Sequence, residues 1–457
     1  MNKATVEIKR FIDQLQQSKT KSKSIYPNLG KQGIQDRHKR TRRNIHKPFP
    51  LLQGQTKYPL SQDSRNVLRP IFQTLLENRS TWGTYYQKRI QEISIGTNDP
   101  LPKGESYTYI PKEIRAIIEE SNPHRLGKRY TCSLPNGRTA NIHLIGFEKR
   151  TTKPRFFENA IEKIYQWLLL ADTFGKSNAC SKTMNVYIYF TNHKKNLPKE
   201  TNTHISLKHA NTAFTSTCQV STEMNMFREE EWLKVFIHET FHNMGFDFSK
   251  MDEGKWLPTL QTMFRVEKDT RLYESYTEMW AEIVHMVFVT VYSSSAPALR
   301  EANKTMDRLF KQYEENMIYE QRFACFQCAK VLHHAMMNYS TFAQPFDPNA
   351  PVLYHEETAA FSYFIVRSIL LFHMNEFIKW SIDNNGETEE YPLIFSKTHK
   401  NVLAYCRLIQ THYKDPNYIQ ALEMANQSVS NPMKATYGKW IKTTLRMTVF
   451  ELDNSKN

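Results

Sequence analysis

The second half of the chain constrains the fold most strongly, because from residue 225 onward apolar side chains recur at helical spacing and strand signals nearly vanish. A break at 339–358 is rich in proline and aromatic residues, which interrupt regular structure. No internal repeat is visible. We therefore predict an all-helical C-terminal part, with helices over 227–244, 271–292, 297–338, 358–382, 402–426 and 433–449.

The first half mixes helix and strand signals. Periodic apolar residues predict helices over 68–93 and 155–174, and the Asn136-Gly137 pair predicts a tight hairpin turn. Runs at 184–191 and 203–216 are strand-like. We predict an α+β fold. A mixed α/β lobe with a small sheet spans 67–224, a helical lobe spans 225–457, and a metal site lies in the cleft between them.

Residues 1–66 form a basic segment that we predict to be a disordered arm and linker. Residues 1–50 contain 13 Lys and Arg and 3 Asp and Glu, so 13 − 3 gives +10 of the chain's formal net charge of +15. Such an arm can bind nucleic acid or another acidic partner without sequence preference, act as an import signal, or be a solvated tail. The densest stretch, 37–47, lacks the interleaved aromatics that stack on bases.

The composition predicts a soluble protein. No apolar run reaches the roughly 18 residues that a membrane helix needs, and the first residues are polar rather than signal-like. The six cysteines stand mostly isolated among apolar residues, which favours free buried thiols in a reducing compartment. We expect an intracellular protein of the cytoplasm or nucleus, or a virion component, and not a secreted one.

One cysteine pair has metal-like spacing. Cys325 and Cys328 form a C-x-x-C, and His333 and His334 follow. A second zinc site there would need four ligands and only one motif-like pair is present. Because Cys325 and Cys328 share a helical face with Leu332, core packing is the favoured interpretation.

The strongest chemical motif is "HETFH", which holds His238, Glu239 and His242. Positions i and i+4 of an α-helix lie one above the other, so both histidines can direct a ring nitrogen at one ion. Glu239 lies to one side of the pair, where it can take a proton from a metal-bound water. The alternative is a helix with two well-paired structural histidines.

A second segment, 271–288, favours the metal interpretation. Glu274, Glu278, Glu282 and His285 fall near one helical stripe, and the other faces are apolar. Carboxylates on a buried helix are costly unless they are paired or bind a metal. Two histidines and one such carboxylate would make a three-ligand zinc site with one open position.

With these residues the chain resembles the gluzincin metallopeptidases, of which the thermolysin and neprilysin types are familiar. "ESYTEMWA" is similar to that group's third-ligand pattern, which implies Glu274 as the third zinc ligand and Glu278 as the acid that orients a ligand histidine. If the same pattern is aligned one helical turn later, Glu278 is the ligand and Glu282 is its supporting acid. Both alignments stay open. The 31 residues between His242 and Glu274 are more than in the thermolysin type.

The resemblance implies two further parts. An edge strand before the zinc helix would bind the substrate backbone, and "HANTAFTS" makes Asn211 and Ala213 candidates, although an ordinary strand is an equal alternative. A tyrosine or histidine from the helical part would polarise the oxyanion. The residues of the right type that we would test first are Tyr363 and His355, and the others available are Tyr354, His204, His285 and Tyr276.

Three functions therefore compete. The leading hypothesis is a zinc-dependent peptide hydrolase in which Glu239 activates the attacking water. The second is a catalytically silent scaffold that binds nucleic acid or another acidic partner through its arm, and the third is a metal-free helical protein. An intact Glu239 favours the first. The likeness of the lysine-rich arm and zinc motif to uncharacterised proteins of large DNA viruses suggests a viral origin.

Overall fold

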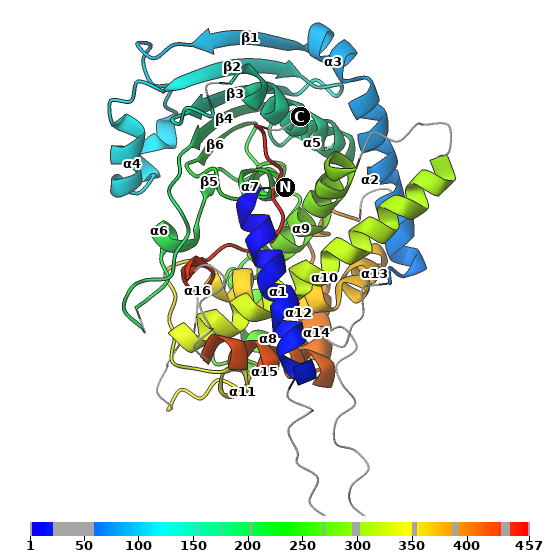
Figure 1. The fold of residues 1–457 in the computed structure, drawn as a ribbon. Coiled ribbons are helices and arrows are strands. Elements are labelled where there is room, and N and C mark those ends of the chain that lie inside the picture. The colour runs from blue at the N-terminus through cyan, green and yellow to red at the C-terminus, as the bar shows by residue number, and fades with distance from the viewer. Residues whose placement is uncertain are drawn as a thin grey trace, which may run out of the picture.

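The computed structural model describes residues 2–21, 59–151, 153–176, 178–201, 203–267, 270–294, 302–349, 354–385, 392–430 and 439–455. The fold is α+β, as predicted, with one six-stranded mixed sheet above a larger group of helices (Figure 1). The basic stretch 37–47 lies outside the described residues, so its partners stay predictions.

The strands are β1 (Ile90–Ile95), β2 (Leu126–Ser133), β3 (Thr139–Gly146), β4 (Thr183–Phe190), β5 (Ala213–Thr215) and β6 (Ser221–Met226). The helices of the first half are α1 (Lys3–Lys21), α2 (Gln62–Ser80), α3 (Trp82–Arg89), η3 (Glu105–Tyr109), α4 (Lys112–Glu119), α5 (Pro154–Phe174) and α6 (Leu207–Ala210). Those of the second half are α7 (Trp232–Asn243), η4 (Glu253–Lys255), α8 (Leu257–Gln261), α9 (Leu272–Ser293), α10 (Ala302–His334), α11 (Tyr339–Phe342), the π-helix η6 (Phe361–Val366), α12 (Arg367–Phe372), α13 (Met374–Asn384), α14 (His399–His412), α15 (Pro416–Ser430) and α16 (Trp440–Thr443).

The sheet has the order β1-β2-β3-β4-β6-β5. The first three strands are antiparallel, β3, β4 and β6 run parallel, and β5 is an antiparallel edge strand. Alternate residues of β3 and β4, such as Ile142 and Val186, are fully buried in the same apolar core as Trp167 of α5. This alternation follows from the two-residue period of a strand and leaves the opposite face more polar.

The predicted hairpin is confirmed, since Ser133 and Thr139 pair across a turn in which Gly137 has φ +81°. The run 184–191 is β4, but most of 203–216 is not strand: α6 occupies part of it, and only β5 is extended. Two strands were not predicted. β1 continues directly from a helical pattern, and β6 reads "STEMNM", with few of the β-branched residues that mark strands.

Several predicted helices have different limits. The segment 402–426 is two helices, α14 and α15, and 68–93 ends in β1. The helix predicted over 433–449 is wrong beyond Thr443, where α16 ends and residues 444–449 are not helical; its first residues, 433–438, lie outside the described part of the chain. There Glu231 accepts hydrogen bonds from the backbone N–H groups of Met447 (2.7 Å) and Thr448 (2.5 Å). A buried carboxylate thereby replaces the helix carbonyls as acceptor.

The N-terminal segment is not disordered throughout, because residues 3–21 form α1. Ile8, Phe11 and Ile12 have the spacing of one helical face and are buried, and the Phe11 ring lies 4.8 Å from the Phe326 ring of α10. α1 crosses α10 on the near side of the molecule (Figure 1). The charged composition of this segment predicted disorder, but its apolar helical face packs into the core.

One cluster of buried apolar residues includes both the inner face of the sheet and the helices below it. Only five residues separate the end of β6 at Met226 from the start of α7 at Trp232. The helix that contains "HETFH" therefore lies directly beneath β5 and β6 (Figure 1). None of the described helices is long and apolar enough to span a membrane.

The prediction of six free thiols is wrong for one pair, since Cys180 and Cys218 form a disulfide. They are 38 residues apart in the sequence, and only the parallel pairing of β4 with β6 brings their loops together. The other four cysteines are free and buried. Burial raises the pKa of Cys328 to about 12, which agrees with core packing of Cys325 and Cys328.

Candidate metal centre

Helix α7 carries the histidine pair and is buried along its whole length. It ends in a Schellman arrangement, in which Gly245 donates to the His242 carbonyl (3.1 Å) and Phe246 to the Phe241 carbonyl (2.8 Å). Gly245 has φ +64°, and a Cβ there would lie 3.0 Å from Cys218 Sγ, so the position needs glycine. The helix end is therefore fixed by sequence and by packing.

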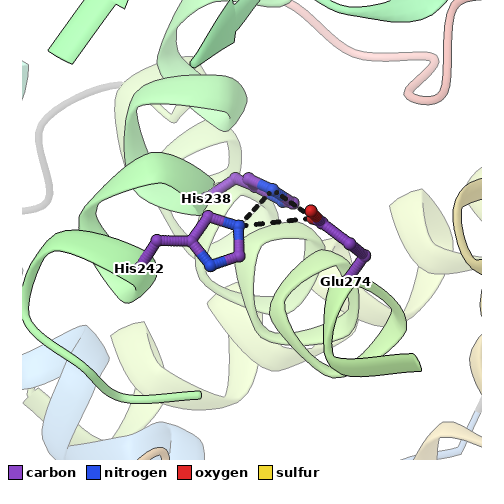
Figure 2. A group of neighbouring side chains, drawn as sticks. All are labelled: His238, His242 and Glu274. Atoms are coloured by element: carbon purple, nitrogen blue, oxygen red, sulfur yellow. Dashed lines mark hydrogen bonds and ion pairs between the residues drawn. The ribbon is translucent and has the colours of Figure 1, made fainter. Parts of the chain in front are cut away.

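Three donor atoms converge between α7 and α9 (Figure 2). The Nε2 atoms of His238 and His242 lie 3.0 Å apart, and Glu274 Oε2 lies 3.0 Å from the first and 3.3 Å from the second. All three residues are buried. Among the described residues this is the group whose ligand atoms are close enough together to hold a metal ion.

The spacing of these atoms fits a tetrahedral ion. Bonds of about 2.0–2.1 Å at tetrahedral angles place neighbouring ligand atoms about 3.3 Å apart. Two ring nitrogens and a carboxylate oxygen at such distances need a cation or protons between them, because without either they would repel one another through their lone pairs. A donor set of two imidazoles and one carboxylate suits divalent transition metals, zinc among them.

Asp247, which we did not predict from the sequence, binds Nδ1, the outer ring nitrogen of His242. Nδ1 hydrogen-bonds to the carboxylate of Asp247, which also accepts from the Ser249 backbone N–H (3.0 Å) and hydroxyl (2.7 Å). The chain reversal at Gly245 returns Asp247 to the ring. A carboxylate partner of this kind fixes the tautomer in which Nε2 is free to bind a metal.

The outer nitrogen of His238 faces Glu278. Nδ1 lies 2.9 Å from Glu278 Oε1, an ion-pair contact that is not aligned as a straight hydrogen bond. Glu278 also forms an ion pair with Lys234, one turn before His238, and lies 3.8 Å from Arg367. The arrangement matches the alignment in which Glu274 joins the metal group and Glu278 orients a histidine. Glu282 instead pairs with Arg367 at 2.7 Å.

The electrostatics of the group are set by burial and by the carboxylates around the two histidines. Burial alone would lower the pKa of His238, but the Glu278 and Glu274 carboxylates raise it to about 9. Burial would also lower the pKa of His242, but the Asp247 and Glu274 carboxylates raise it well above its ordinary value. Despite burial, the two histidines lower the pKa of Glu274. The pocket therefore favours positive charge at the place where the three atoms meet.

Glu239 lies beside this group and is only 7% exposed. Burial raises the pKa of its carboxyl, although His238 and His242 act in the opposite direction. Burial is the main cause that raises the pKa of Tyr363, and the Glu274 and Glu239 carboxylates raise it further. A candidate base and a candidate hydroxyl donor therefore share the surroundings of the donor group.

Tyr363 is the better placed of the two residues that we selected for the oxyanion. Its ring lies 6.2 Å from the His238 ring, edge to face. It belongs to the π-helix η6, a rare geometry that often marks functional positions. His355 lines a different small cavity, with His204, His334 and Tyr354, whose lining includes none of the three metal-group residues.

The other aromatic and histidine candidates have contacts of their own. The Tyr276 hydroxyl donates to the Leu393 carbonyl (3.1 Å), and the Tyr354 hydroxyl to Glu356 Oε2 (2.7 Å). His204 lies 3.7 Å from Glu357, and its ring is 5.3 Å from that of His355. These contacts favour structural roles.

His285 shares α9 with Glu274 but lies outside the metal group, and we expect it to make stability depend on pH. Burial, reinforced by Lys234 and Arg446 and opposed by Glu231, lowers the pKa of His285 to about 3. Between pH 6.5 and 3 the unfolded chain binds a proton there that the folded chain does not, so the free energy of unfolding falls as pH falls through this range.

A His285→Gln variant tests this dependence. The slope of unfolding free energy against pH should become shallower between pH 6.5 and 5, by up to about 1.4 kcal/mol per pH unit. Denaturant titrations of both proteins at several pH values measure it. Parallel slopes would mean that His285 is not the proton-linked group.

The edge strand predicted over 209–216 is present only in part: β5 covers 213–215, and Asn211 lies outside it, at the end of α6. β5 pairs only with β6 among the described strands and lies against α7. Ala213, its first residue, is buried. Asn211 lies just before it, where its backbone carbonyl accepts from Arg228 Nε (2.8 Å) and its side-chain oxygen accepts from the Thr358 hydroxyl (2.7 Å). Only the Nδ2 group of Asn211 is left to serve a ligand as a donor.

Comparisons with protein-family models, with curated proteins and with solved structures find no match to this chain.

Proposed function

We propose that this protein is a zinc-dependent peptide hydrolase. The observation that carries the proposal is the convergence of His238 Nε2, His242 Nε2 and Glu274 Oε2 within 3.0–3.3 Å, with Glu239 buried beside them. A purely structural histidine pair would need neither a third ligand atom at this spacing nor a buried carboxylate in the position of a base.

His238, His242 and Glu274 would hold the ion. When bound, zinc supplies a Lewis acid that makes water acidic near neutral pH and polarises a carbonyl group. Glu239 accepts the proton of the attacking water and later passes it to the leaving amine. The Tyr363 hydroxyl donates a hydrogen bond to the oxygen on which negative charge develops.

The substrate class follows from the edge strand. An extended peptide can add to the outer edge of β5 through backbone hydrogen bonds, which demand no particular side chains. The Asn211 Nδ2 group is a further donor at the start of that edge. This mode suits a segment of extended polypeptide and favours hydrolysis of peptide bonds over that of small esters or sugars.

Metal content and chelation test the proposal. Purified protein is expected to contain about one zinc per chain, and a His238→Ala variant should contain far less. A chelator should abolish cleavage of a mixed peptide library, and added zinc should restore it. Zinc without any cleavage would favour the silent-scaffold alternative, and absence of zinc even after it is offered would remove both.

A further inference from the structure

Asn243 links the metal-bearing helix to the edge strand. It follows His242 directly and is fully buried. Its Nδ2 group donates to the Ser216 carbonyl (2.8 Å) and to the Thr215 hydroxyl. Thr215 is the last residue of β5, so one side chain at the end of α7 holds the end of the strand that would receive the substrate.

The backbone at the end of α7 is bound from the same side. Cys218 donates its N–H to the His242 carbonyl (3.1 Å), and the Ser181 hydroxyl donates to the Asn243 carbonyl (2.7 Å). The Asn178 side chain donates to the Met244 carbonyl (3.0 Å). The last carbonyls of the helix, which water usually satisfies, are thus bonded to the loops beside the sheet.

The Cys180–Cys218 disulfide closes this arrangement covalently. It joins the loop before β4 to the turn 216–220 between β5 and β6, which we call the clamp turn. The sulfurs pack against Gly245. Cys180 is buried, Cys218 is half-buried and Val220 is 65% exposed, so the bond lies near the surface on its Cys218 side.

We propose that Asn243 and the Cys180–Cys218 disulfide are positioning elements, which fix β5 relative to the metal group and so set how a substrate strand lies over it. This inference rests on the proposed function in so far as it concerns substrate. β5 is only three residues long and is paired on one side, so the clamp turn is needed to hold it. The metal group has its own supports in Asp247 and Glu278.

Asn243 and the Cys180–Cys218 disulfide together form the clamp, which hydrogen exchange tests without any assay of activity. In the zinc-loaded full chain, tris(carboxyethyl)phosphine reduces the disulfide: the S–S bond breaks, two thiols form, and the phosphine takes the oxygen of water to become a phosphine oxide. Amide exchange over 213–220 should then become roughly ten-fold faster or more, as in a locally opened segment. Exchange over 232–243 and the zinc content should stay unchanged.

Matched variants separate the two parts of the clamp. Cys180→Ser/Cys218→Ser should exchange fast over 213–220 and respond no further to the phosphine. Asn243→Asp keeps the volume but loses both N–H donors, and Asn243→Ala removes the group altogether, so either should also accelerate exchange. Asn141→Ala is the control, because it removes a comparable amide contact, to Asn185 (3.1 Å), elsewhere in the same sheet.

The kinetics of peptide cleavage then test whether the clamp positions the substrate. Clamp variants should raise KM for a library peptide by roughly three- to ten-fold, the value of one or two hydrogen bonds, with kcat nearly unchanged. Unchanged exchange over 213–220 would overturn the clamp, and faster exchange over 232–243 with loss of zinc would show general destabilisation instead. If no peptide is cleaved at all, the proposed function fails, while the exchange data still decide whether the clamp exists.

Discussion

A Glu239→Gln variant is expected to keep its zinc and to lose peptide cleavage by a factor of about 10²–10⁴, the usual contribution of a general base. The amide has nearly the shape of the carboxylate but cannot accept the proton of the attacking water. Because Glu239 is not one of the three converging donors, zinc binding should not depend on it. Metal analysis and steady-state kinetics on the same preparation measure both quantities.

The control for this variant is Glu200→Gln, the same chemical change at an exposed position. It should cleave like the unmodified protein. Full activity in Glu239→Gln would contradict the assignment of the base. Loss of both zinc and activity would instead mean that Glu239 supports the metal group, and the mechanism would need another base.

The parts of the fold that the sequence predicted are those with local signals. The helical second half, the hairpin at Asn136-Gly137 and β4 all follow from periodicity or turn chemistry within a few residues. The failures depend on distant partners. β6 becomes a strand through its pairing with β4, and the non-helical residues after Thr443 donate backbone hydrogen bonds to a buried carboxylate more than 200 residues earlier.

The residues of the candidate site also divide into those with a local sequence signal and those whose role depends on distant partners. His238, Glu239 and His242 are visible because the motif is local, and Glu274 because a second helix carries its own pattern. Asp247 had a weak signal, an acid placed just beyond the helix-ending Gly245. Lys234 had one too, four residues before His238. Arg367 had none, since its role depends on how α12 packs against α9.

Zinc affinity is expected to distinguish the roles of Glu274 and Glu278 on α9, and the expected effects are large. A Glu278→Gln variant should weaken zinc binding by about 10–100-fold, the usual cost of losing a residue that orients a ligand histidine. Glu274→Gln should weaken it by more, because it removes one of only three protein donors. Competition with a chromophoric zinc chelator measures both affinities.

The order should reverse for stability of the metal-free protein. Glu278 neutralises the fully buried Lys234 and lies 3.8 Å from Arg367, so its loss leaves buried positive charge with too few partners and is expected to cost about 3–5 kcal/mol. In the metal-free protein Glu274 pairs with the two histidines, which can release their protons when Gln takes its place, whereas Lys234 and Arg367 stay charged. The cost of Glu274→Gln in unfolding free energy should therefore be smaller than that of Glu278→Gln. If Glu278→Gln instead lost zinc more completely than Glu274→Gln at equal stability, Glu278 would be the ligand, and the metal would lie on the other side of the His238 ring.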